Sequence, residues 1–119
     1  MKVENKAEIR LRGMLGFAMR AGRVTVGTDA VCTAMAKSGK DRAKLVLISS
    51  SASDGTKKKI STKAEFYGVD CFEINLDSDE LGSLLGKLYA PATVAITDDG
   101  FAREIRLAID SLGKEVTNN

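Results

Sequence analysis

The length and composition of this chain predict one globular domain. It has 119 residues, of which 44% are hydrophobic and 29% are charged, a balance typical of globular folds. No apolar run reaches the ~18–20 residues that a membrane-spanning helix needs, and the charged start MKVENKAEIR lacks the apolar stretch of a secretory signal. We expect a single domain over residues 1–119 that stays in the cytoplasm and does not bind membranes.

The residue types present exclude histidine-based catalysis and give little support to other enzymatic chemistry. The chain has no histidine, so a serine or threonine nucleophile has no histidine base beside it. The two cysteines, Cys32 and Cys71, cannot complete a tetrahedral zinc site, and their apolar neighbours favour burial as small hydrophobic side chains. Neither a P-loop nor a GxGxxG run is present. We therefore expect a non-enzymatic protein without a metal, a cofactor or a small-molecule substrate.

Charge is distributed unevenly between the two halves of the chain. Residues 1–63 hold 14 Lys and Arg against 5 Asp and Glu, a net charge of +9, whereas residues 64–119 hold 4 against 11, a net charge of −7. The whole chain is close to neutral, at +2. A basic region of this size attracts polyanions, and the acidic region beside it restricts how they approach.

Apolar residues recur with helical and strand periods in alternation along the chain. Residues 6–21 are predicted as a helix ended by Gly22, followed by a strand at 24–26 and a helix at 28–38. The apolar run AKLVLIS at 43–49 is typical of a central strand covered on both faces. Further along we expect, in order, a helix at 54–67, a strand at 69–74, a helix with the stripe Leu81, Leu84, Leu85 and Leu88, a strand at 93–97 and a last helix over about 101–112.

This alternation predicts an α/β fold, specifically a three-layer α/β/α sandwich around a central four-stranded mixed sheet. Two glycines in the first helix, Gly13 and Gly16, weaken it intrinsically, so we expect them to allow the close approach of another element. Asp98 and Asp99 precede the last helix and are expected to cap it and to complement its dipole.

Three junctions between the predicted elements have features suited to binding. In the first, VGTD at 26–29, the glycine lets the backbone approach a ligand and Thr28 can cap the helix. The free N–H groups there favour an anion, although Asp29 repels one. The second, SSSAS at 49–53, is rich in hydroxyl groups and is followed by Lys57, Lys58, Lys59 and Lys63. The third, YAPA at 89–92, is a stiff apolar loop before the last strand.

Three runs of the sequence resemble a known family. They are LGFAMRAGRVTVGTDAV, KSGKDRAKLVLISSSASDGTKKKI and DELGSLLGKLYAPATVAITDDGF, and the most specific parts are the ELGxxxGK run, the KLVLI strand and the ending TDDGFA. Over about residues 8–109 the chain resembles the kink-turn-binding ribosomal-protein family, in particular its YlxQ-like bacterial branch. The resemblance implies an α/β/α sandwich that binds RNA at one edge through these three junctions.

The resemblance also implies how the first junction works. Kink-turn binders carry Gly-Thr/Ala-Asn-Glu there, with a lysine one helical turn on, and read the guanines of tandem sheared G·A pairs. Gly27 and Thr28 match this pattern, whereas Asn is replaced by Asp29, Glu by Ala30 and Lys by Thr33. Asp29 can still accept a hydrogen bond from a guanine edge, while the other two changes remove one interaction with a base and one with a phosphate.

We therefore predict a protein that binds structured RNA, kink-turn-like or ribosomal, through one edge of the sandwich. The residues predicted to contact RNA are Arg23, Gly27, Thr28, Asp29, Thr33, Lys37, Ser50, Lys57, Lys58, Ala90 and Pro91. The alternative is a protein–protein interaction module on the same fold. That alternative predicts a contiguous exposed apolar patch of several hundred Å².

Overall fold

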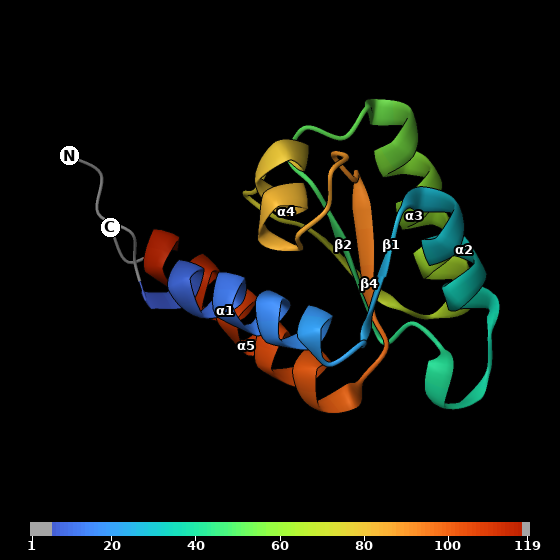
Figure 1. Ribbon diagram of the computed structural model, residues 1–119, viewed down its shortest axis with the longest axis horizontal. Coiled ribbons are helices and arrows are strands. Elements are labelled where there is room, and N and C mark those ends of the chain that lie inside the picture. The colour runs from blue at the N-terminus through green and yellow to red at the C-terminus, as the bar shows by residue number, and fades with distance from the viewer. Residues whose placement is uncertain (1–5, 118–119) are drawn as a thin grey trace.

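A four-stranded mixed sheet lies at the centre of the molecule (Figure 1). Its strands are β1 (Val24–Val26), β2 (Leu45–Ile48), β3 (Asp70–Glu73) and β4 (Thr93–Ile96), in the spatial order β1-β4-β2-β3. Strand β4 is antiparallel to both β1 and β2, whereas β2 and β3 are parallel. The computed structural model describes residues 6–117, with the side chains of residues 6–112.

The two central strands are buried on both faces, as the apolar run at 43–49 predicts. Leu45 and Leu47 belong to one core and Val46 and Ile48 to the other, because successive side chains of a strand alternate between its faces. The first core is completed by α1 (Lys6–Arg20), α4 (Ser78–Leu84) and α5 (Asp99–Thr117), and the second by α2 (Thr28–Ala36) and α3 (Asp54–Tyr67). The predicted α/β/α sandwich is confirmed.

Helices α1 and α5 run antiparallel along one face, and the start of α1 and the end of α5 project beyond the sheet (Figure 1). An ion pair between Arg10 and Glu104 joins them. Asp98 caps α5 as predicted, because its Oδ2 accepts a hydrogen bond of 2.9 Å from the backbone N–H of Phe101. On the opposite face, a short 3-10 turn, η1 (Gly39–Asp41), connects α2 to β2.

Two helices end earlier than their apolar patterns predict. Helix α2 ends at Ala36, and α4 ends at Leu84. Leu88 is fully exposed, so the prediction that it belongs to the apolar stripe of this helix is wrong. Gly86 accounts for the second difference, because it adopts a left-handed conformation with a φ of 69° that ends the helix. Gly22, with a φ of 73°, follows the end of α1 as predicted.

The prediction for the glycines of α1 is wrong. A Cβ built on Gly13 would have nothing within 4 Å, and one on Gly16 would meet only the Arg20 side chain of the same helix, 3.6 Å away. In the described part of the chain, no other element comes that close to either residue. The glycine at a close approach is Gly82 of α4, where a Cβ would lie 2.5 Å from the carbonyl oxygen of Tyr89.

Both cysteines are free thiols, half-buried beside the core between the sheet, α2 and α3. Burial raises the pKa of the Cys71 thiol from the ordinary value of 9.0 to about 11. A shift of that size lowers the thiolate fraction near neutral pH about 100-fold. We expect iodoacetamide to modify Cys71 slowly in the native protein and rapidly in urea, as followed by mass spectrometry. Equal rates in both conditions would contradict this burial.

Candidate nucleic-acid interface

The three junctions meet at one end of the sheet. Because β4 runs antiparallel to both of its neighbours, its start lies beside the ends of β1 and β2. The N–H of Gly27 donates to the carbonyl of Thr93 at 3.0 Å, and the N–H of Ser49 donates to that of Ala92 at 2.9 Å. We call residues 27–29, 49–53 and 89–92 together the loop end.

The first junction is shaped by Gly27, the N-cap residue of α2. Its φ of 105° lies in the region that side chains other than glycine rarely adopt. Thr28 was expected to cap the helix, and this is wrong: α2 has no side-chain cap, and the Thr28 hydroxyl lies 3.2 Å from the buried hydroxyl of Thr93. The first N–H groups of α2 therefore keep their capacity to bind an anion.

The residues that depart from the kink-turn pattern are exposed on the first two turns of α2. The Asp29 carboxylate is fully exposed, and its Oδ1 lies 4.0 Å from Nζ of Lys59. The Thr33 hydroxyl donates to the carbonyl of Asp29 at 3.1 Å, and Ala30 is also exposed. An ion pair this long and exposed contributes little, so the Asp29 carboxylate is available to a ligand.

Hydrogen bonds connect the serine-rich junction after β2 to the start of α4. The hydroxyl of Ser78 lies 2.9 Å from that of Ser49 and 3.0 Å from that of Ser51, and the N–H of Ser78 donates to Ser51 at 2.8 Å. Ser53 caps α3 by accepting from the N–H of Thr56 at 3.1 Å. These hydroxyls hold the loop in place. Ser50, the serine predicted to contact RNA, is half-buried. Its N–H donates to the carbonyl of Leu76 at 2.9 Å.

An acidic segment borders the serine junction. Asp77 and Glu80 form a capping box at the start of α4, in which Oδ1 of Asp77 accepts from the N–H of Glu80 at 2.8 Å. In return, Oε1 of Glu80 accepts from the N–H of Asp77 at 3.1 Å. The loop end is therefore basic on the α3 side and acidic on the α4 side, so it attracts an anion on the α3 side and repels one on the α4 side.

The lysines of α3 are not equivalent. Lys57 lies 3.4 Å from a carboxylate oxygen of Glu73, and Lys59 is the distant partner of Asp29. Lys58 is exposed, and no carboxylate among the described residues pairs with it. Of the three, Lys58 has its ammonium group free for a phosphate.

The apolar loop is supported by α4. The carbonyl oxygen of Tyr89 and Cδ of Pro91 would lie 2.5 Å and 3.2 Å from a Cβ on Gly82. Pro91 is buried, whereas Tyr89 and Ala90 are exposed beside it. Sequence reasoning missed Gly82 as a determinant of this loop, although it belongs to the ELGxxxGK run.

Two of the predicted RNA-binding residues lie at the opposite end of the sheet. Arg23 precedes β1, and its carbonyl accepts from the N–H of Thr97 at 2.9 Å, beyond the far end of β4. Lys37 follows the last residue of α2. β1 ends and α2 begins at the loop end, so the start of β1 and the end of α2 lie across the sandwich from it. The structure does not bring these two residues together with the others.

The described residues contain no group of three or more His, Cys, Asp and Glu side chains that can hold a metal ion. None of their helices combines the length and the apolar character needed to cross a bilayer. Their large exposed hydrophobic side chains are distributed over α1, α3, α5 and the segment after α4: Ile9, Phe17, Phe66, Leu88, Tyr89 and Leu107.

Comparison with known proteins identifies the family. RNA-binding protein YlxQ from Enterococcus faecium is 35% identical over 98 residues, covering 82% of this chain and 88% of that protein. RNA-binding protein YlxQ from Bacillus subtilis is 37% identical over 97 residues, covering 82% and 92%. A solved structure of a protein with unknown function from Bacillus halodurans matches with a TM-score of 0.76 and 29% identity, covering 85% of this chain and 97% of that one. Residues 10–106 match the family model, so the chain belongs to the ribosomal protein L7Ae/L30e/S12e/Gadd45 family, as the sequence predicts, with YlxQ proteins of bacteria among its relatives.

Proposed function

We propose that this protein is a non-enzymatic, cytoplasmic, single-domain RNA-binding protein whose loop end holds a structured RNA of the kink-turn type, as part of a ribosome or another ribonucleoprotein. The observation that carries the proposal is the convergence of three unlike features on one end of the sheet. They are the uncapped start of α2, the unpaired Lys58 on α3 and the exposed Tyr89-Ala90 segment. The names of the YlxQ relatives support RNA as the ligand.

Each feature suits a different part of a bent RNA. The N–H groups at the start of α2 and the ammonium group of Lys58 attract phosphates. The exposed carboxylate of Asp29 accepts a hydrogen bond from the amino or imino group of a guanine. The apolar segment at Tyr89 and Ala90 packs against an unstacked base at the bend. The acidic start of α4 disfavours a strand that passes on that side.

A titration with three RNAs tests this proposal. The RNAs are a kink-turn, the same RNA with its tandem G·A pairs replaced by Watson–Crick pairs, and an uninterrupted duplex. We expect the kink-turn to bind more tightly than both others at one salt concentration, since phosphates alone do not distinguish them. Equal affinity for all three would overturn the proposal.

Neutralising Lys57, Lys58 and Lys59 should flatten the salt dependence of RNA binding. The triple glutamine variant should lower the slope of log K against log salt by ~0.7–0.9 for each phosphate that the protein no longer neutralises. Because the other two lysines have carboxylate neighbours, Lys58→Gln alone should account for most of the change. Lys6→Gln at the start of α1 is the matched control and should leave the slope as it is. A triple variant with the wild-type slope would mean that α3 binds no phosphate.

A further inference from the structure

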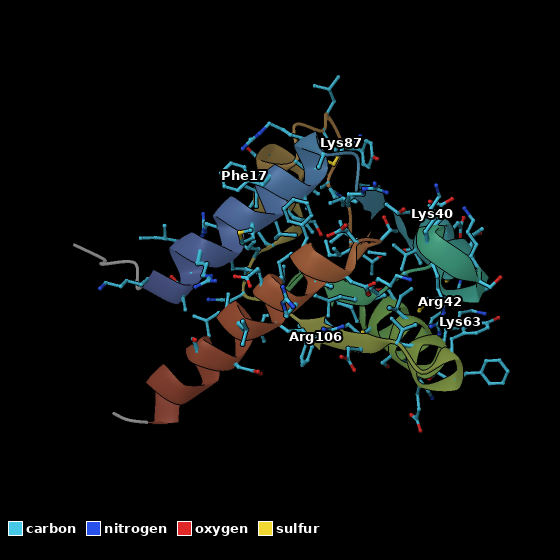
Figure 2. All side chains as sticks on the ribbon, turned by 90° about the horizontal axis from the view of Figure 1, so that it is seen from below. Phe17, Lys40, Arg42, Lys63, Lys87 and Arg106 are labelled. Atoms are coloured by element: carbon cyan, nitrogen blue, oxygen red, sulfur yellow. The ribbon has the colours of Figure 1, made fainter. Side chains whose placement is uncertain are left out.

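The end of the sandwich opposite the loop end carries a second group of cations. Figure 2 looks onto this end, where Lys40, Arg42 and Lys63 gather on one side of the molecule. Lys37 follows α2 and belongs to the same segment as Lys40 and Arg42. We call Lys37, Lys40, Arg42 and Lys63, with the aromatic residue Phe66, the basic end.

The fold brings these residues together from two elements. The segment after α2 is fixed to it by a hydrogen bond of 2.9 Å from the N–H of Ala43 to the carbonyl of Ala34. Arg42 then reaches the last turn of α3, where its guanidinium donates to the carbonyl of Tyr67. Lys63 lies one turn before Tyr67 on the same helix. The loop after α2 and the end of α3 thereby form one continuous surface.

The positive charge of this surface is largely uncompensated. Residues 37–44, KSGKDRAK, contain four basic residues and one acidic residue, Asp41. Within the described part of the chain, no carboxylate forms an ion pair with Lys37, Lys40 or Lys63. Like charges on one side of a molecule repel each other, and a polyanionic ligand relieves that repulsion.

An exposed aromatic ring stands beside these cations. The Phe66 side chain is 81% exposed, and its ring meets that of Tyr67 edge-on, with centroids 4.9 Å apart and an interplanar angle of 86°. Tyr67 is itself half-buried against the core between the sheet, α2 and α3. The Phe66 ring therefore contacts Tyr67 on one side and is open to solvent on the other.

We propose that the basic end is a second RNA-binding surface, one that takes a single strand. A base stacks on Phe66, and the neighbouring phosphates lie against Lys63, Arg42 and Lys40. Aromatic rings beside a basic groove are how proteins bind single strands without sequence preference. The acidic side chains of a peptide would satisfy the charge but have no flat ring to cover Phe66, whereas each nucleotide carries both a phosphate and a base, so the exposed ring favours RNA.

This second surface goes beyond the proposed function because it uses other residues and another form of RNA. Helix α3 begins at the loop end and finishes at the basic end, and its 14 residues span about 20 Å. One base-reading pocket cannot include both ends. The basic end can hold a flanking single strand of the same RNA or act without the loop end.

The two tyrosines of this tryptophan-free chain allow each end to be observed separately. Tyr67 lies at the basic end and Tyr89 at the loop end, so the fluorescence of a Tyr89→Phe variant reports on Tyr67 alone. An oligouridylate of about ten nucleotides, a length within the range that such surfaces cover, should quench that fluorescence. Phe66→Ala should weaken oligouridylate binding roughly tenfold. The Lys40→Gln, Lys63→Gln double variant should lower the salt slope by ~0.7 for each phosphate that these lysines neutralise in the wild type.

Phe17→Ala is the matched control. Phe17 is also an exposed aromatic residue, 55% exposed, with the Arg20 guanidinium 4.8 Å from its ring centroid, and it lies on α1. Its variant should bind oligouridylate as the wild type does. The proposal is overturned if Phe66→Ala binds equally well while its circular dichroism melt is unchanged, or if polyglutamate binds as tightly as oligouridylate. The kink-turn titration depends on the loop end, so either proposal can fail alone.

Discussion

Asp29→Asn combined with Ala30→Glu and Thr33→Lys should strengthen binding to a kink-turn RNA tenfold or more. The asparagine regains two amide donors that the carboxylate lacks, and it removes a negative charge that repels phosphate. The lysine can bind a further phosphate one turn along α2. All three positions are exposed, two on the first turn of that helix and Thr33 one turn further along, so the fold should persist. A tenfold gain corresponds to ~1.4 kcal/mol, about the value of one or two hydrogen bonds.

Two measurements serve as controls for this gain, one of stability and one of affinity for an RNA without G·A pairs. In the single variant Asp29→Asn, loss of the charge from the start of the helix should lower stability by only ~0.3–1 kcal/mol, measured by thermal unfolding. Affinity for the RNA without G·A pairs should rise far less than affinity for the kink-turn. If both affinities rise equally, the change is electrostatic and the start of α2 does not read bases.

Gly82→Ala should destabilise the protein and displace the apolar loop. The added Cβ would lie 2.5 Å from the carbonyl oxygen of Tyr89 and 3.2 Å from Cδ of Pro91. The nearer of these atoms belongs to the backbone, so α4 and the loop have to separate. Overpacking of this kind costs ~1–3 kcal/mol, measurable by urea unfolding. Because the loop would move away from the rest of the loop end, the affinity for kink-turn RNA should fall as well.

Gly13→Ala makes the identical chemical change where space is open. A Cβ there has no neighbour within 4 Å, and the residue lies inside α1. Alanine should therefore stabilise the protein by ~0.5–1 kcal/mol through helix propensity alone, without effect on RNA binding. If Gly82→Ala behaved like Gly13→Ala, the loop would not depend on its close packing against α4.

The predicted elements that proved correct rest on interactions between near neighbours in the chain. The apolar run of β2 forms a strand buried on both faces, and Gly22 ends α1. Asp98 caps α5 by accepting from the N–H of Phe101, three residues further on. Such features depend on residues within one or two turns, so a local pattern is enough to reveal them. The similarity that places the chain in its family likewise lies in the order of residues along the sequence.

Tertiary structure decided which of these local features meet. The loop end exists because β4 lies between β1 and β2 and runs against both. The Thr28 hydroxyl lies beside that of Thr93, 65 residues away, instead of capping its own helix. Gly82 is needed because a loop seven residues further on passes so close to α4 that a Cβ there would lie 2.5 Å from the Tyr89 carbonyl oxygen.

The sequence alone therefore determined the kinds of element, their order and the family. It did not determine that Arg23 and Lys37 lie across the sandwich from the loop end, or that Lys40, Arg42 and Lys63 form one surface with Phe66. The physical reason is that helix and strand periods arise from the geometry of a few consecutive residues. The partner of an exposed side chain depends on strand order and on backbone interactions between segments far apart in the chain.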